Sequence, residues 1–370
     1  MNELRRNFLF GSLAATVLPR HALAEPVYGT GIIGVGNRGT SLLKTIVADP
    51  NARVTAVCDI KPDRLDRAAS IASRDNPKTY NDYRKLLEDK SVEAVFISAP
   101  CDLHVEMAIA ALRAGKHIYC EKPLGITAKS IRDVLRAAKG TNTVFMVGHQ
   151  RRSDTQLRQV IAKIHEGIAG KVIMMKAQRH SSGDFAHDGQ SADWLFDASR
   201  SGDVIVENAV HNLDVCNWAA GNRPDQAAGF GGTLLYVNDP PGRTITDGYT
   251  LSYDYANGVK LSFTQVAFHP SSLPFGGQQT HIYCTEGVVD VESATFHPRG
   301  RQSKPVVLAE EINENRERNH IGMFYDCIRR GTKPETDITQ GAVAALTSIM
   351  GREAYKQKRV VTWKELGVEI

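Results

Sequence analysis

The stretch 31–39, with the sequence GIIGVGNRG, constrains the fold of this chain more than any other. The apolar run 28–33 before the second glycine is typical of a buried strand, and residues 38–48 carry helix-spaced apolar side chains. The glycines therefore mark a strand-to-helix turn, which allows backbone N–H groups to approach a pyrophosphate and the helix to pack closely on the strand. The candidate pyrophosphate-binding residues are Gly34, Gly36, Asn37, Arg38 and Gly39.

A second predicted strand, 53–58, ends in Asp59 at the distance where an acid that binds ribose is expected. A carboxylate there accepts both adenosine ribose hydroxyls and repels a 2′-phosphate, so NAD is favoured over NADP. The alternative is that Asp59 only begins a turn and caps the next helix. With strand, glycines, helix, strand and acid in register, we interpret this half as a dinucleotide-binding Rossmann domain.

Strand and helix signals alternate up to the run 143–147, which predicts a doubly wound parallel sheet in residues 25–148. The strand 92–98 ends near Ser98, Pro100 and His104, where ligands meet the carboxyl ends of strands. These three residues are candidates to line the nicotinamide side of a cofactor. For His104, a structural role in the first helical turn is an equally good interpretation.

The N-terminus has the order of an export signal: charged residues, a short apolar run and the small residues Ala22-Leu23-Ala24. Arg5 and Arg6 precede Phe8-Leu9, which is typical of a twin-arginine signal, and the run is too short to form a stable membrane span. We therefore expect residues 1–24 to be removed and the protein to be exported folded to the periplasm. A dehydrogenase there would need to hold its NAD tightly.

The chain of 370 residues has ordinary apolar (42%) and charged (23%) fractions, which indicate a soluble globular enzyme. The net charge is +4 and falls by two units without residues 1–24, which argues against a nucleic-acid partner. The six cysteines form neither a metal-binding nor a disulfide pattern, so we expect buried apolar roles.

Residues 149–370 are predicted to form an α+β domain. Long strands separated by hairpin turns at Asn257-Gly258 and Glu286-Gly287 predict an open, mostly antiparallel sheet with helices on one face. The uncovered face predicts a homodimer or homotetramer. The helices expected at 319–330 and 338–355 should pack back against the first domain.

The strand 117–120 ends in Glu121-Lys122-Pro123, and proline fixes the direction of the lysine before it. Here the chain resembles the glucose–fructose oxidoreductase, inositol dehydrogenase and rhizopine catabolism family, known as Gfo/Idh/MocA. The resemblance implies that Glu121 and Lys122 lie at the cofactor, with Lys122 between nicotinamide and substrate. Without the resemblance, the two would pass for a surface ion pair.

The segment 201–218 resembles the same family's second signature, an acid and a histidine four residues apart. Apolar residues at 206, 210, 213 and 215 predict one helix, so Glu207 and His211 should project from one face and interact. The resemblance makes His211 the base that takes the hydroxyl proton, a task that suits imidazole. Glu207 stands where Asp is commoner, which leaves its role less certain.

Several other residues are candidates for substrate contact. Asp214 either orients the imidazole of His211 or is a surface acid. Arg151 and Arg152 either reach the substrate or cofactor phosphates or are solvated. Trp194 either covers a sugar or anchors a long loop. The substrate candidates are therefore Arg151, Arg152, Trp194, Asn208 and Asp214.

The leading hypothesis is an NAD-dependent oxidoreductase that acts on a secondary alcohol of a sugar, glycoside or cyclic polyol. The alternative is an exported glycosidase of the family 109 type. Such an enzyme uses bound NAD to oxidise a sugar carbon, which allows elimination of the glycosidic substituent, and then reduces the carbon again. Those glycosidases lack the intact Glu-Lys-Pro sequence, so a dehydrogenase is favoured. A regulator without catalysis is the third possibility, disfavoured because both halves of the expected site are filled.

Overall fold

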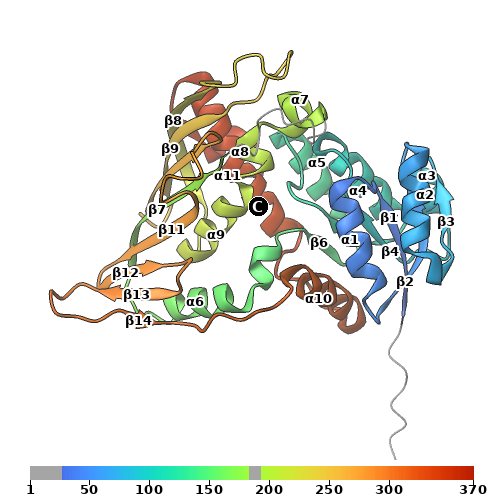
Figure 1. Cartoon of the computed structure of the whole chain (residues 1–370), viewed down its shortest axis with the longest axis horizontal. Helices are drawn as coiled ribbons and strands as arrows, with labels where there is room; N and C mark the ends of the chain where they lie inside the picture. Colours follow the sequence, from blue (N-terminus) through green and yellow to red (C-terminus); the bar gives the residue numbers. More distant parts are fainter. Residues whose placement is uncertain (1–26, 183–192) are drawn as a thin grey trace, which may run out of the picture.

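The computed structural model describes residues 27–182 and 193–370. Figure 1 shows two halves, each built on one sheet, with the C-terminal helices between them. The predicted signal lies outside the described residues, as does most of the loop before Trp194. No helix within the described ranges is long and apolar enough to cross a membrane.

The first sheet has six parallel strands in the order β3-β2-β1-β4-β5-β6, which confirms the predicted doubly wound architecture. Apolar stripes such as Leu42, Leu43 and Ile46 hold its helices on the sheet. The strands are β1 (Tyr28–Ile33), β2 (Ala52–Cys58), β3 (Lys78–Tyr80), β4 (Ala94–Ile97), β5 (His117–Cys120) and β6 (Phe145–Val147). The helices are α1 (Asn37–Val47), α2 (Pro62–Ile71), α3 (Tyr83–Glu88), α4 (His104–Arg113) and α5 (Ala128–Ala138).

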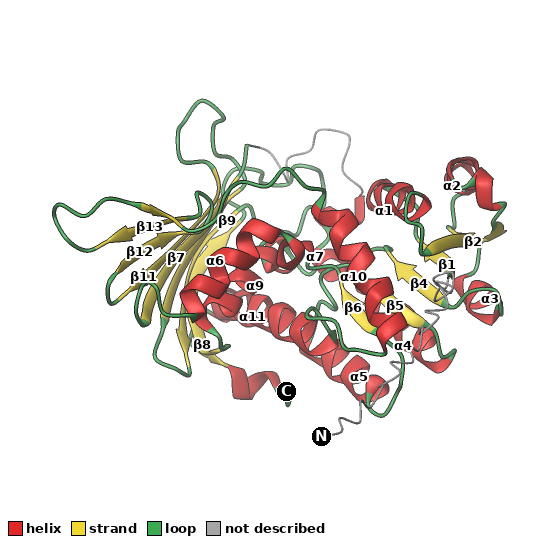
Figure 2. Ribbon diagram, turned by 90° about the horizontal axis from the view of Figure 1, so that it is seen from below, coloured by secondary structure: helices red, strands yellow, loops and turns green. Residues whose placement is uncertain are grey.

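The second sheet has nine strands and is mostly antiparallel, as predicted; β7 and β10 form a parallel pair. Helices cover one of its faces (Figure 2). The strands are β7 (Val172–His180), β8 (Pro224–Gly232), β9 (Gly248–Tyr255), β10 (Lys260–Val266), β11 (Gly277–Cys284), β12 (Gly287–Asp290), β13 (Thr295–Pro298), β14 (Val306–Val307) and β15 (Val361–Thr362). The helices are α6 (Thr155–His165), α7 (Ala198–Ser201), α8 (Val204–Glu207), α9 (Val210–Ala220), α10 (Arg316–Arg330) and α11 (Ile338–Gln357).

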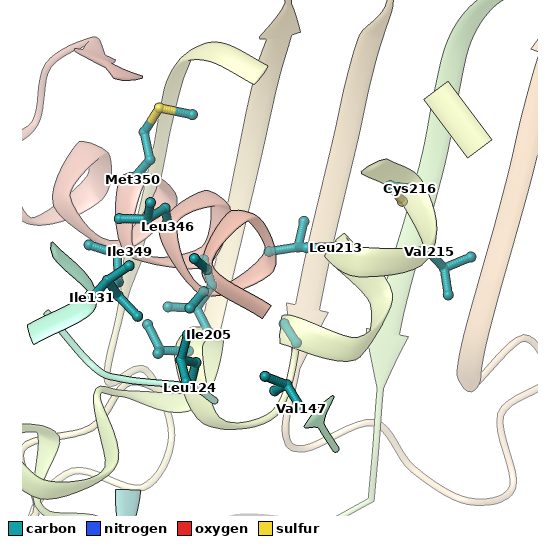
Figure 3. Close-up of a cluster of buried hydrophobic side chains, with 14 of the residues drawn as sticks. Leu124, Ile131, Val147, Ile205, Leu213, Val215, Cys216, Leu346, Ile349 and Met350 are labelled. Atoms are coloured by element: carbon teal, nitrogen blue, oxygen red, sulfur yellow. The ribbon is translucent and has the colours of Figure 1, made fainter. Parts of the chain in front are cut away.

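The last two helices join the halves. Helix α10 packs on the first sheet, where the rings of Phe96 and Phe324 lie 5.4 Å apart and Thr30 bonds Tyr325. Helix α11 runs through a continuous core: Figure 3 shows its Leu346 and Ile349 between Ile131 of α5 and the α8–α9 segment. This core fixes the orientation of the two sheets relative to each other. All six cysteines are free, and five are buried, in agreement with their expected apolar roles.

Candidate active site

The glycine turn forms because two of its positions accept no side chain. Gly34 has a positive φ of 84°, and a Cβ there would lie 2.6 Å from the carbonyl oxygen of Ser98. A Cβ on Gly39 would lie 1.9 Å from the carbonyl oxygen of Gly34, so α1 could not approach β1. At Gly36 the nearest atom is the flexible end of Arg64, 3.3 Å away. No backbone atom of another segment therefore lies within 4 Å of the place where a Cβ on Gly36 would stand.

Asp59 holds the same turn from the end of β2. Its Oδ2 accepts the Val35 N–H at 2.9 Å, and its Oδ1 accepts the Lys61 N–H at 3.0 Å. The Arg64 guanidinium lies 3.9 Å from Oδ2. Helix α1 begins after Gly36 without a side-chain cap, so its first N–H groups are not taken by a capping side chain. These features fit the pyrophosphate and ribose of a dinucleotide.

The candidates after β4 divide into two kinds. Ser98 and Pro100 are half-buried at the end of the strand, and the enclosed Ser98 Oγ has no partner among residues 27–182 and 193–370. His104 is buried, and its ring nitrogens lie 2.8 and 2.9 Å from the carbonyl oxygens of Pro123 and Ala99. Its contacts therefore favour the structural interpretation: His104 joins the loops that follow β4 and β5.

Glu121 connects the glycine turn with the loop that carries Lys122. Its Oε1 accepts the Arg38 Nε–H at 2.8 Å, and its Oε2 accepts the Lys122 backbone N–H at 3.2 Å. Arg38 also pairs with Glu317 at the start of α10. Because Glu121 is buried and engaged on both oxygens, the structure gives it and the Arg38 side chain a positioning function at the turn.

Lys122 lies against Glu207, so the two family signatures meet. Its ammonium donates to the Glu207 Oε1 at 2.6 Å and to the Glu207 carbonyl oxygen at 2.5 Å. Both side chains are largely buried, with 15% and 16% exposure. The ion pair bridges the end of β5 and the end of α8.

The helix expected through Glu207 and His211 is broken, which corrects the prediction of one helix. Helix α8 ends at Glu207 and α9 begins at Val210. The Val204 carbonyl accepts the N–H groups of both Asn208 and Ala209, so the turn widens as in a π-bulge. The Glu207 carbonyl is used by Lys122, and Glu207 pairs with the lysine rather than with His211.

His211 lines a cleft of about 640 Å³ together with Gln150, Arg151, Gln278 and the segment 313–317. Burial lowers the pKa of His211 well below its ordinary value, and the charges of Lys122, His149, Arg151 and Arg179 lower it further. The imidazole is therefore neutral near pH 7 and can accept a proton. Arg151 contacts Glu292 at 3.4 Å, so it is not a solvated arginine.

The other substrate candidates are not among the residues that line the cleft. Asp214 is buried, which overturns the interpretation as a surface acid, and it binds Arg152 through two hydrogen bonds of 2.8 Å. This buried pair also shows that Arg152 is not solvated and does not line the cleft. Asn208 accepts from Gln265 at 3.0 Å, and Trp194 packs half-buried against the core. For Trp194, the packed interpretation is favoured.

Sequence reasoning missed His149, which follows β6, and the segment 313–317. His149 carried a usable signal, because it follows a strand end just as Ser98 and Lys122 do. The segment at the start of α10 carried none, since its position depends on how α10 returns to the first sheet. No cluster of three or more possible metal ligands occurs within residues 27–182 and 193–370.

Comparison with known proteins places this geometry in a family. The model described as "Oxidoreductase family, NAD-binding Rossmann fold" matches residues 28–149, and the model of the "GFO/IDH/MocA C-terminal domain" matches residues 157–290. Together the two models cover more than half of the chain. The chain belongs to the Gfo/Idh/MocA family.

Curated relatives of this Gfo/Idh/MocA protein include enzymes of two kinds. An inositol 2-dehydrogenase/D-chiro-inositol 3-dehydrogenase of Lactiplantibacillus plantarum is 35% identical over 193 residues, 51% of each chain. A glycosyl hydrolase family 109 protein of Stenotrophomonas maltophilia is 32% identical over 191 residues, 47% of this chain and 41% of that protein. The chain thus aligns with about half the length of these relatives.

Solved structures of the family share the whole fold. A levoglucosan dehydrogenase in complex with NADH and levoglucosan has a TM-score of 0.78 at 21% identity, covering 90% of this chain and 99% of that one. A myo-inositol 2-dehydrogenase from Lactobacillus plantarum has a TM-score of 0.74 at 21% identity, with coverages of 91% and 99%. At these identities the likeness establishes the fold.

Proposed function

We propose that this protein is an NAD-dependent oxidoreductase that transfers a hydride between bound nicotinamide and a secondary alcohol of a sugar, glycoside or cyclic polyol. The observation that carries the proposal is the ion pair of Lys122 with Glu207 beside His211. This contact brings the lysine of the first domain and the histidine of the second domain together in one site. Family membership and the dehydrogenases among the relatives support it.

The glycine turn and Asp59 would hold NAD, which supplies the hydride acceptor at its nicotinamide ring. Uncapped N–H groups at the start of α1 would bind the pyrophosphate, and the free face at Gly36 permits the approach. The carboxylate of Asp59 favours a free ribose 2′-hydroxyl over a 2′-phosphate, so NAD is preferred to NADP. We propose that the cofactor stays tightly bound, and mass spectrometry of natively purified protein tests this.

His211 would take the proton of the reacting hydroxyl. It is neutral because burial, and then the surrounding positive charges, lower its pKa. The Lys122 ammonium would hold and polarise the same oxygen, with Glu207 fixing its direction through two contacts. As the hydride leaves carbon, the alcohol becomes a carbonyl and His211 carries the proton.

The test is Lys122→Met, assayed with NAD and a panel of myo-inositol, levoglucosan and glucose. We expect NADH formation to fall by about a hundred- to ten-thousandfold, because a positioned polar group is lost from the reacting oxygen. NAD binding, measured by calorimetric titration, should remain. Full activity in this variant would defeat the assignment.

The alternative function is hydrolysis of a glycoside through transient oxidation. The observation that favours this alternative is the similarity to a relative named as a glycosyl hydrolase family 109 protein. Cleavage of a nitrophenyl glycoside without accumulation of NADH would support this alternative. Accumulation of NADH with a free sugar or polyol would support the dehydrogenase.

We further propose twin-arginine export to the periplasm on the basis of residues 1–24. Cell fractionation of the natural sequence and of the R5K/R6K double variant tests this proposal. The natural protein should appear in the periplasm and the double variant in the cytoplasm. Equal distribution of the two would contradict it.

A further inference from the structure

His211 has no orienting partner among the acids that its sequence context suggests. Its Nδ1 is enclosed and makes no hydrogen bond to any residue that the structure describes. Glu207 pairs with Lys122, and Asp214 pairs with Arg152. A general base works in one tautomer, and the partner of its second nitrogen normally fixes that tautomer.

His149 occupies the place of such a partner. Its ring lies edge-on to that of His211, with centroids 5.7 Å apart and an interplanar angle of 84°. Its Nδ1 also lies 3.8 Å from the Oδ2 of Asp214. His149 is thus near both the imidazole that lines the cleft and a buried carboxylate.

Packing alone does not account for an imidazole at position 149. The side chain is 1% exposed, and neither nitrogen has a hydrogen-bond partner within residues 27–182 and 193–370. Leaving a buried polar group without a hydrogen bond destabilises the folded state, so an apolar side chain would fill the space better. Both ring nitrogens would, however, gain a hydrogen-bond partner if the ring linked His211 to Asp214.

Asp214 is suited to anchor such a link. Burial raises the pKa of its carboxyl, but the Arg152 guanidinium, through its charge and its hydrogen bonds, helps to outweigh burial and to keep the pKa below its ordinary value. Asp214 is therefore ionised and can accept a hydrogen bond in addition to the two from Arg152.

We propose that His149 is a positioning residue that connects His211 to Asp214. The link requires the Nδ1–H of His149 to donate to the Asp214 carboxylate, 3.8 Å away in this structure, and the Nε2 of His149 to accept the Nδ1–H of His211. The Nε2 of His211 is then left as the proton acceptor for the substrate hydroxyl. No proton leaves His149; the linked carboxylate stabilises the imidazolium that forms at His211. This inference rests on the proposed dehydrogenase function.

The test compares His149→Phe with His149→Gln, whose amide reaches the place of Nε2. We expect H149F to lower kcat about ten- to hundredfold, as loss of an outer partner does for metal-bound histidines, with KM and NAD affinity almost unchanged. H149Q should recover most of the loss. His117→Phe is the matched control, because this histidine lies at the start of β5, at the strand end opposite Lys122, and its ring accepts the Val144 N–H; the kcat of this variant should not change.

A second measurement does not depend on the folding of a variant. In wild-type protein labelled with ¹⁵N-histidine, the ring ¹⁵N shifts of His211 should report the Nδ1–H tautomer, with the signal assigned through H211Q. An Nε2–H tautomer overturns the inference, as does wild-type kcat in H149F. If K122M is inactive while H149F is fully active, only the inference fails; if both are fully active, the proposed function fails.

Discussion

At the scale of single residues, the site depends on which partner each charged group has. The pair Arg152–Asp214 is the clearest case, because both side chains are almost fully buried, at 6% and 3% exposure. The Arg152 guanidinium also lies 5.0 Å from the ring centroid of Trp218. The structure therefore makes this pair part of the buried framework.

Removal of one member of the pair should destabilise the protein strongly. We expect Asp214→Asn to lower the free energy of unfolding by about 3–5 kcal/mol, because it removes the carboxylate that binds the buried Arg152 guanidinium through two hydrogen bonds. The double variant Arg152→Met/Asp214→Leu should recover much of this loss. Urea unfolding measures both, with Asp133→Asn in the exposed pair Lys129–Asp133 as a control that should change little. A D214N protein of normal stability but raised KM would instead indicate substrate contact.

At the scale of elements, interruptions of regular structure place the functional groups. The widened turn between α8 and α9 leaves the Glu207 carbonyl to Lys122 and redirects the chain before His211. The glycine turn likewise brings the start of α1 against the end of β1. Both features lie where strands of the first sheet end, so the elements converge on one region.

Two alanine substitutions in the turn should separate packing from cofactor binding. In Gly39→Ala the new Cβ meets the Gly34 carbonyl oxygen, and we expect overpacking to lower stability by about 1–3 kcal/mol and to weaken NAD binding. In Gly36→Ala the Cβ meets only the end of Arg64, so stability should hold while NAD affinity falls. Thermal unfolding and calorimetric titration measure the two effects. Normal NAD affinity in G36A would contradict cofactor binding at this turn.

At the scale of the whole molecule, the second sheet ends in an apolar surface. Two neighbouring loops form it, in contact through the rings of Tyr236 and Phe268. The exposed side chains of this loop surface, including one at the end of β8, are Phe230, Leu234, Leu235, Val237, Leu273 and Phe275. Exposed apolar side chains that gather on neighbouring loops are typical of an interaction site. We propose that a second copy of the chain covers it.

Charge placed in the loop surface should therefore break the assembly. We expect wild-type protein to be a dimer or tetramer and Leu235→Asp/Phe275→Asp to be monomeric, because a buried unpaired carboxylate opposes association. Light scattering coupled to size exclusion measures the mass. Ile168→Asp, an exposed apolar position before the start of β7, is the control and should assemble normally. A monomeric wild-type protein would refute the proposal.

The sequence alone determined the elements whose signals are local. Steric and periodic constraints act between residues that are close in the sequence, so short stretches are enough to recognise these elements. They are the glycine turn at 34, 36 and 39 with Asp59, the alternating strands and helices of the first sheet, and the hairpin turns of the second sheet. These were sufficient to predict both sheets, whereas the roles expected of Lys122 and His211 depended on the resemblance to the Gfo/Idh/MocA family.

Only the tertiary structure decided which side chains became partners. Lys122 binds Glu207 across 85 residues, and Arg152 binds Asp214 across 62. The break after Glu207, the burial of His104 between two loops and the position of His149 beside His211 depend on contacts between different elements of the fold. Packing and burial set these contacts between distant parts of the chain, and no spacing along the sequence records them.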